Sequence, residues 1–190
     1  DADLLPRLLR ALDKTSVNVT LRPLAPEATD LLARGVIDLV IGVSATLPPD
    51  AIAAHLFDEE FVCAVRRGHP RVSRKLTLET FLELPHLLIA PRGDPGGVVD
   101  AALAARGLRR RVAVRTHTFQ SAPLIIARSD LVITAPRRVL VPAAKAFDLR
   151  LVPPPLELAP FAVYQAWHPR VQNDPEHAWF RAIVASAARG

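Results

Sequence analysis

Hydrophobic positions along the first 43 residues switch between helical and strand spacing. Leucines recur every three or four positions from Leu4 to Leu12, which predicts a helix, with Pro6 in its first turn. Apolar residues then alternate from Val17 to Leu21, as in a strand. Pro26 and Glu27 begin a helix that runs through Leu32 and that Gly35 can end, and the run IDLVIGV (37–43) is a buried strand. We therefore predict a β-α-β unit after an opening helix.

The same alternation of helical and strand patterns continues through the middle of the chain. It predicts helices at 77–84, 98–106, 119–128 and 137–147, and strands at 86–90, 111–115 and 131–134. Helices that alternate with strands favour parallel pairing, because each crossover returns the chain to the same end of the sheet. We expect an α/β protein whose sheet is largely parallel.

Two polar or proline-rich segments interrupt this pattern and are candidate hinges. Residues 66–75 read RRGHPRVSRK, and residues 153–160 read PPPLELAP, which is too rich in proline for a central strand. Each lies next to an extended apolar run, FVCAV (61–65) or FAVYQAW (161–167). A final helix is expected at 175–188. The hinges indicate two lobes rather than one.

Composition is that of a globular protein. Half of the residues are hydrophobic and 23% are charged, and every apolar run is far shorter than the roughly 18 to 20 residues of a membrane span. The single cysteine, Cys63, excludes an intrachain disulfide. Its apolar neighbours favour a buried, unreactive side chain.

The formal net charge of +5 raises the question of nucleic acid binding. Arginines crowd together between Arg66 and Arg74 and could neutralise phosphates. Acidic residues interrupt the basic ones elsewhere, however, and we find no helix-turn-helix, zinc-ligand spacing or RNA-binding aromatic motif. We do not expect this stretch to contact DNA itself.

Motifs for catalysis, metal binding or cofactor binding are missing from the sequence. No two of the six histidines have the i, i+4 spacing of zinc ligands on a helix, and no serine lies in a G-x-S-x-G turn. The run GDPGG (93–97) fits neither the P-loop nor the dinucleotide fingerprint, and is better explained as a permissive loop before a helix. We expect no enzyme, no metal site and no cofactor.

Five motifs resemble one protein family and occur in its order. The chain is similar to the effector domain of LysR-type transcriptional regulators, in particular the branch of nodulation regulators and regulators of naphthalene and nitroaromatic degradation. The motifs are GVIDLVIG (35–42), EEFVCAVRRGHP (59–70), PHLLIAPRG (85–93), RRVAVRTHTFQSAPLIIARSDLVITAPRRV (110–139) and WHPRVQNDPEHAWFR (167–181). Any one of them is weak evidence, but together they span most of the chain.

The resemblance implies a domain organisation. It implies two Rossmann-like α/β lobes of the periplasmic-binding-protein type II kind, joined by two crossover strands. Lobe I would comprise residues 1–66 and 166–190, and lobe II residues 67–165. A winged DNA-binding domain and linker helix, absent from this chain, would precede residue 1, as would the first strand of lobe I. The resemblance also implies a cytoplasmic protein.

A ligand cleft between the lobes is the candidate site. In parallel sheets ligands bind beyond the carboxyl ends of the strands. The positions that follow predicted strands, and that we expect to bind an effector, are Ala25, Pro26, Ser44, Pro91, Arg92, Gly96, Thr118, Phe119, Gln120 and Pro136.

The turn from 116 to 121 carries the most specific part of this prediction. Backbone N–H groups are free where a strand passes into a helix, and they suit a carboxylate. Thr118 and Phe119 match the family's effector-contacting turn: the hydroxyl would bind an anion and the ring would pack on the ligand, although Phe119 could equally be a core residue of the helix. Arg92 could pair with an acidic effector or simply be solvated.

Two differences from the aromatic-degradation branch broaden the ligand prediction. Those relatives often carry a histidine in the turn, where this chain has Thr118 with His117 one residue earlier, and another in the glycine loop, where it has Gly96. We therefore expect only a small organic or aromatic acid, with no membrane partner.

The resemblance also implies partners. A homodimer would form through the helix at 4–12 and the helix near 28–32 of one copy and the helix at 98–106 of the other, with a tetramer and promoter DNA engaged by the full-length protein. The leading alternative is a solute receptor for transport with the same fold, and the next is an enzyme on that scaffold.

Overall fold

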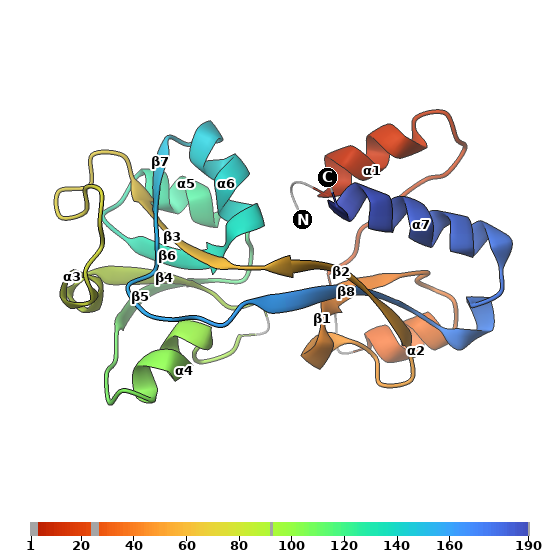
Figure 1. The fold of residues 1–190 in the computed structure, drawn as a ribbon, viewed down its shortest axis with the longest axis horizontal. Coiled ribbons are helices and arrows are strands. Elements are labelled where there is room, and N and C mark those ends of the chain that lie inside the picture. The colour runs from red at the N-terminus through yellow and green to blue at the C-terminus, as the bar shows by residue number, and fades with distance from the viewer. Residues whose placement is uncertain (1–3, 24–26, 92, 190) are drawn as a thin grey trace. The chain divides into compact units, whose positions relative to one another are not determined.

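The chain forms two compact units. The computed structural model describes residues 4–23, 27–91 and 93–189. Unit 1 comprises residues 1–59 and 161–190, and unit 2 comprises residues 60–160. The backbone therefore passes between the units twice, directly after β2 and directly before β8 (Figure 1).

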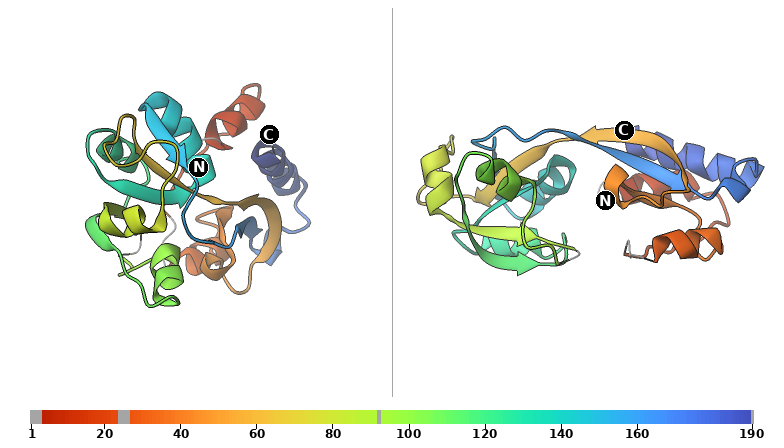
Figure 2. Two further views of the ribbon diagram at one scale, coloured as in Figure 1. Left: turned by 60° about the vertical axis from the view of Figure 1, so that its left-hand side comes forward. Right: turned by 90° about the horizontal axis from the view of Figure 1, so that it is seen from below.

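Unit 1 is built on a small antiparallel sheet. Its strands are β1 (Val40–Val43), β2 (Ile52–Glu59) and β8 (Phe161–Trp167), its helices α1 (Leu4–Leu12), α2 (Ala28–Ala33) and α7 (Pro175–Arg189), and its 3-10 turns η1 (Ser44–Thr46) and η2 (Pro169–Val171). The order is β1-β8-β2, and Ala166 in the central strand lies opposite both Val40 and Ala53. Helices α1 and α7 lie side by side (Figures 1 and 2).

Both sides of the unit 1 sheet are covered. Leucines of α1 pack with Val184 of α7 and with Leu56 and Phe57 of β2, and Val163 of β8 contacts this cluster. A second cluster joins α2 to Val40 and Ala166. Residues 163 and 166 point to opposite sides of a strand because side chains alternate along it. The two clusters therefore lie on opposite sides of the sheet. In α1, the helical spacing of the leucines determines which side of the helix is buried.

Unit 2 carries a five-stranded mixed sheet. Its strands are β3 (Phe61–Arg66), β4 (Pro85–Ile89), β5 (Arg111–Thr116), β6 (Val132–Pro136) and β7 (Leu149–Val152), and its helices α3 (Leu78–Glu83), α4 (Val98–Ala104), α5 (Ala122–Ala127) and α6 (Arg137–Ala146). The strand order is β5-β4-β6-β3-β7. Strand β4 runs parallel to both β5 and β6.

Hydrophobic clusters lie on both faces of this sheet. Cys63 and Val65 of β3 join the cluster that contains residues of α3 and α4, whereas Val62 and Ala64 join the one that contains residues of α5 and α6. Figure 2 shows these helix pairs on opposite sides of the strands. Strand β3 is buried on both faces, which explains why its sequence is continuously apolar.

The structure corrects two details of the expected secondary structure. Residues 16–23 form no strand: Leu21 is 66% exposed, and no described strand pairs with this segment. An alternating pattern becomes a strand only when another strand satisfies its backbone. In addition, helix α5 begins at Ala122 and not at Phe119.

The expectation of a largely parallel sheet is also wrong. Both pairings in unit 1 are antiparallel, as are those of β3 with β6 and with β7. Strands β2 and β7, which were not predicted, account for part of the difference. Strand β2 reads IAAHLFDE, with weak alternation, and β7 has only four residues.

Candidate functional site

Three strands of unit 2 have their carboxyl ends at the same end of its sheet, which we call the edge. Because β5, β4 and β6 are neighbours and parallel, their carboxyl ends lie together. This edge brings together Pro91 after β4, Thr118 after β5 and Pro136 at the end of β6. The sequence predicted that positions after these strands would lie together, and the structure places Pro91, Thr118 and Pro136 at this edge.

The turn after β5 is organised by hydroxyl groups. The Oγ of Ser121 lies 2.8 Å from the Oγ1 of Thr118 and 3.0 Å from the Oγ1 of Thr116, which in turn accepts a 3.3 Å hydrogen bond from the Thr118 N–H. When Ser121 donates its proton to Thr118, the Thr118 hydroxyl is free to donate to a ligand. Thr118 is exposed and positioned for that role.

Phe119 and Gln120 lie at the tip of this turn. Both are exposed, and Phe119 retains 36% of its accessible surface. Since α5 begins at Ala122, Phe119 is neither helical nor a core residue. The backbone N–H groups of both residues donate to no partner in the described part of the chain. Free donors therefore lie beside an exposed aromatic ring.

His117 links the turn to the neighbouring strand. Its Nδ1 donates to the carbonyl of Ala90 across 3.1 Å, and the Ala90 N–H donates to the carbonyl of Thr116 across 2.8 Å. In the neutral ring this tautomer leaves Nε2 as an exposed acceptor. His117 thus fixes the end of β4 to the turn that follows β5.

The glycine loop after β4, residues 93–97, forms another part of the edge. Gly93 has a φ of 77°, a left-handed conformation that glycine tolerates. Arg115 donates from Nη1 to the carbonyls of Pro95, at 2.6 Å, and Asp94, at 3.3 Å. Gly96 packs against Asp100, and the Gly97 N–H donates to Asp100 Oδ2 across 2.8 Å.

A buried charged network lies behind this loop. Arg110 donates from Nε and Nη2 to the two carboxylate oxygens of Asp100, at 2.9 and 2.8 Å, and its Nη1 lies 3.3 Å from Nδ1 of His86. Partial burial acts to raise the pKa of Asp100, but the hydrogen bonds from Arg110 and Gly97 and the Arg110 charge outweigh it and lower that pKa. Burial lowers the pKa of His86 to about 4, against the effect of its hydrogen bond to Phe81.

The remaining predicted positions are distributed differently. Pro136 is half-buried and precedes α6. Ser44 is exposed at the start of η1, directly after β1, and belongs to unit 1. Ala25, Pro26 and Arg92 lie outside the described residues.

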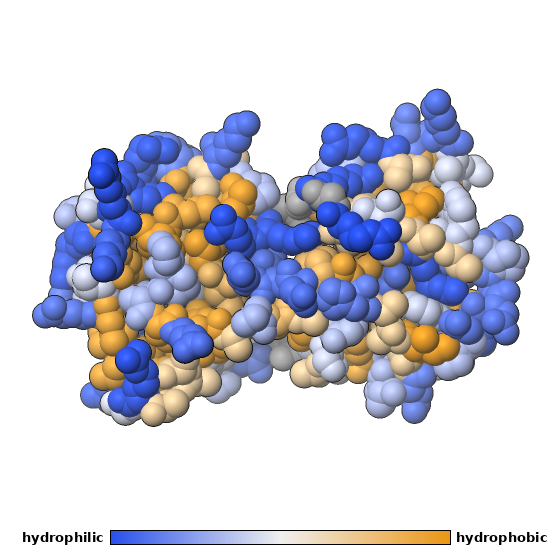
Figure 3. All heavy atoms as spheres, viewed as in Figure 1, coloured by the Kyte–Doolittle hydropathy of each residue, from blue (hydrophilic) through white to orange (hydrophobic). Residues whose placement is uncertain are grey.

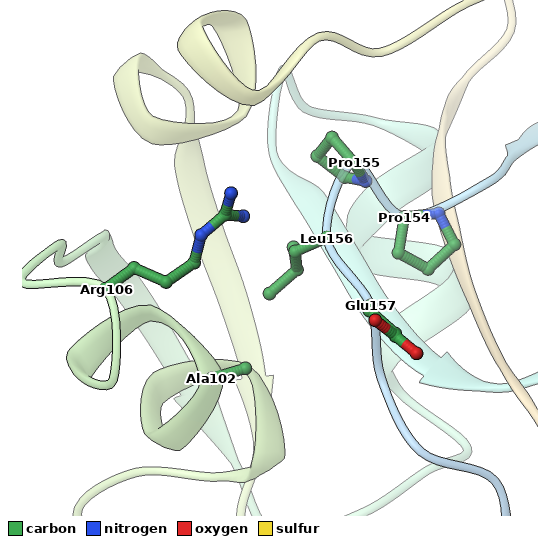
Figure 4. A pocket seen from close by; sticks show the side chains of 6 residues that line it. All are labelled: Ala102, Arg106, Pro154, Pro155, Leu156 and Glu157. Carbon is green, nitrogen blue, oxygen red and sulfur yellow. The ribbon is translucent and has the colours of Figure 1, made fainter.

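A separate hollow of unit 2 lies between α4 and the proline-rich segment before β8. Figure 4 shows Leu156 pointing towards α4, with the Arg106 side chain beside it, and the lining residues are Ala102, Arg106, Pro154, Pro155, Leu156 and Glu157. Figure 3 shows hydrophobic and hydrophilic residues interspersed over unit 2 in this view. None of the predicted effector residues within the described part of the chain is among these lining residues.

Within residues 4–23, 27–91 and 93–189, no three His, Cys, Asp or Glu side chains gather as metal ligands, and no helix is long and apolar enough to cross a membrane. Cys63 is fully buried with its Sγ 3.1 Å from Thr134 Oγ1. Burial raises the pKa of its thiol to about 12, against the effect of the Thr134 hydrogen bond. The prediction of a buried cysteine is confirmed.

Sequence reasoning missed four residues that shape the edge. Ser121 and His117 lie within the predicted turn, so the polar composition of that turn was their signal. Arg110 directly precedes β5 and Arg115 lies within it. Neither gave a local signal, because their partners lie 10 to 24 residues away in sequence.

Comparison with known proteins gives a consistent result. Residues 1–189 match the family model described as the LysR substrate binding domain. Among solved structures, a probable transcriptional regulator from Pseudomonas aeruginosa aligns with a TM-score of 0.83 at 32% identity, over 96% of this chain and 61% of that one. The regulatory domain of MexT, a transcriptional activator from the same organism, gives a TM-score of 0.83 at 28% identity over 97% and 91%. The predicted fold class is confirmed.

Curated relatives are regulators of transcription. SyrM of Rhizobium meliloti (strain 1021) is 35% identical over 189 residues, 97% of this chain and 58% of that protein. NahR of Pseudomonas putida, a transcriptional activator, is 28% identical over 95% of this chain and 61% of its own length. The chain thus spans less than two thirds of these relatives, and it resembles the branch expected from the sequence.

Proposed function

Since the chain belongs to the LysR substrate-binding domain family, whose members are non-enzymatic regulator domains, we propose that it binds a small organic or aromatic acid. In the full-length protein, the ligand would shift the populations of arrangements that position an N-terminal winged helix-turn-helix on promoter DNA in the cytoplasm. The relatives extend well beyond the matched region, which leaves room for such a domain in them.

The turn of residues 117–121 is the observation that carries this proposal. It presents the free N–H groups of Phe119 and Gln120, the hydroxyl of Thr118 and an exposed aromatic ring. The N–H groups and hydroxyl complement a carboxylate, and the ring complements an apolar body. A small organic acid with an apolar body would use all three features.

A thermal-shift screen of small organic acids tests the proposal. An acid at 100 times its dissociation constant stabilises the folded domain by about 2.7 kcal/mol. Thr118→Val removes the hydroxyl at similar volume and should weaken binding of the acid found by about 1 to 2 kcal/mol. Thr20→Val, at an exposed threonine outside the edge, is the matched control. Equal affinity for both variants would place the site elsewhere.

Three further predicted positions belong to the same proposal. Pro91 and Gly96 lie in the loop beside the turn, and Ser44 lies in unit 1. Ser44→Ala should reduce affinity for the same acid by less than Thr118→Val does, because one hydroxyl is lost without disturbing the turn. Titration calorimetry of the two variants gives this ranking.

We further propose a homodimer in which α1 and α2 of one copy contact α4 of the other. Leu9 on α1 and Val98 on α4 are 50% and 40% exposed, so each helix offers an apolar residue to a partner. An isologous dimer uses each patch twice. Leu9→Glu and Val98→Glu should yield folded monomers by light scattering and circular dichroism, whereas Leu21→Glu, at a site 66% exposed, should not. A monomeric wild type at high concentration would contradict the interface.

A further inference from the structure

We propose that the buried ion pair of Arg110 and Asp100 positions the glycine loop, residues 93–97, at the effector-binding edge. This inference rests on the proposed function, because the loop carries the predicted effector residue Gly96. Arg110 and Asp100 bind each other, His86 and the Gly97 N–H rather than the turn that would hold the acid. Their contribution is to fix the backbone beside it.

Asp100 contacts the loop in two ways. Its Oδ2 accepts the Gly97 N–H at 2.8 Å, which fixes the direction of the backbone as it enters α4. Its side chain also fills the space where a Gly96 side chain would lie, since a Cβ there would approach Asp100 Cβ to 3.1 Å and Oδ2 to 3.3 Å. The loop therefore follows wherever the Asp100 carboxylate is held.

Arg110 fixes that carboxylate. Its guanidinium binds both carboxylate oxygens, a geometry that sets the orientation of the carboxylate as well as its place. The Arg110 side chain is only 2% exposed, whereas that of Asp100 is 31% exposed. The buried arginine has little freedom, so it acts as the fixed member of the pair.

His86 connects Arg110 to the core. Its Nε2 donates to the carbonyl of Phe81 at 2.7 Å, which leaves Nδ1 to accept from Arg110 Nη1. His86 and Phe81 are both fully buried, and their rings pack edge to face at 4.5 Å between centroids. A continuous series of hydrogen bonds thus runs from the end of α3 to the Gly97 N–H.

Stability alone is a poor explanation for this arrangement. Replacing a buried ion pair with apolar residues of similar volume is often neutral or stabilising, because burial of charge offsets the attraction. What apolar residues cannot do is hold a backbone N–H in one orientation. Arg115 holds the other side of the loop through the Pro95 carbonyl, so the loop is fixed from two directions.

Hydrogen exchange of the 190-residue chain tests the inference without a ligand. The Gly97 amide is measured relative to that of Val65, which is fully buried in β3 and serves as the reference for opening of the sheet. Arg110→Met should raise this relative rate at least about tenfold, since the carboxylate that accepts the Gly97 N–H loses the guanidinium that orients it. Glu83→Gln breaks the exposed Arg71–Glu83 pair of the same unit and is the matched control, with no change expected.

A double variant separates positioning from stability. Arg110→Met with Asp100→Asn removes both charges while keeping an oxygen that can accept from Gly97. We expect its unfolding free energy to recover towards wild type while Gly97 exchange stays fast. Gly97 exchange that remains at the wild-type relative rate in Arg110→Met would overturn the inference, as would recovery of slow exchange in the double variant.

Benzoate binding, followed by calorimetry, distinguishes this inference from the proposed function. If the wild type binds benzoate, Arg110→Met should lower its affinity, and Glu83→Gln should not. If the chain binds neither benzoate nor any other organic acid but Gly97 exchange still accelerates, the proposed function fails and the anchoring of the loop is supported. If the wild type binds benzoate but Gly97 exchange in Arg110→Met stays at the wild-type relative rate, the proposed function stands and only the anchoring of the loop is overturned.

Discussion

The turn after β5 and the glycine loop after β4 lie at the same sheet edge but are held by different forces. In the turn, the hydroxyls of Thr116, Thr118 and Ser121 hydrogen-bond to one another at the exposed surface. In the loop, charged side chains bind the backbone: Asp100 accepts from the Gly97 N–H, and Arg115 donates to the Pro95 carbonyl.

This difference assigns two roles: the turn contacts the proposed ligand, and the ion pair of Arg110 and Asp100 supports the glycine loop beside it. Neutral hydroxyls exchange partners at little cost, so the turn can rearrange around a ligand. A buried ion pair is costly to break and keeps one geometry. The comparison suggests that changes in the turn alter affinity, whereas changes behind the loop alter stability and the shape of the edge together.

The largest expected effect comes from breaking the support. Asp100→Ala leaves the Arg110 guanidinium buried without its carboxylate, and should lower the unfolding free energy by about 3 kcal/mol. Urea denaturation measures this loss. Glu83→Gln, in an exposed pair, should cost no more than about 1 kcal/mol. Comparable losses for both variants would remove the distinction between buried and exposed pairs.

Acid should weaken the same support by a similar amount. The pKa of His86 is about 4 when folded and 6.5 when unfolded, so below pH 6.5 the unfolded chain binds a proton that the native one does not. Stability should therefore fall between pH 6.5 and 4, by about 3 kcal/mol in total. The lowered pKa of Asp100 adds a further loss below its unfolded value of 3.8.

A substitution at His86 isolates this contribution. His86→Gln retains a donor and an acceptor but has no titrating group, so its stability should vary less over the same pH range. Denaturation midpoints of both proteins at pH 7 and pH 4.5 supply the comparison. Parallel curves for the two proteins would show that the acid sensitivity arises outside this network.

A smaller effect on stability should distinguish a change of side-chain size in the loop from one in the turn. Gly96→Ala places a Cβ 3.1 Å from Asp100 Cβ, and because Arg110 holds Asp100, relief is limited. We expect a loss of about 1 to 2 kcal/mol by urea denaturation. Gln120→Ala, at the exposed tip of the turn, should change stability by less than about 0.5 kcal/mol. A tolerated Gly96→Ala would mean that the loop yields.

Much of unit 2 could be predicted from the sequence, because its helices and strands follow one another as apolar runs of distinct spacing. The turn at Thr118 was located by the same pattern. Residues 16–23 were wrongly predicted to contain a strand, since an alternating pattern says nothing about whether another strand is available to pair with it. Strand β7 has only four residues and left too short a pattern to recognise.

The support behind the loop could not be predicted for a different reason. Asp100 and Arg110 are ordinary charged residues in the sequence, and only folding places them together around Gly97. The carboxylate three residues after Gly97 was a local signal for a helix start, but the arginine that orients it had none. Contacts distant in sequence are set by packing rather than by any local motif.

The position of Cys63 allows opening of the unit 2 sheet to be detected by the reactivity of its thiol. It is the chain's one cysteine, and it lies within β3 between its pairing partners Thr134 of β6 and Val152 of β7. Burial of the thiol, with its pKa of about 12, shields it from alkylating reagents while the sheet is closed. Pulsed thiol labelling followed by mass spectrometry should therefore count openings of this sheet in the unmodified sequence, with opening of unit 1 leaving no mark.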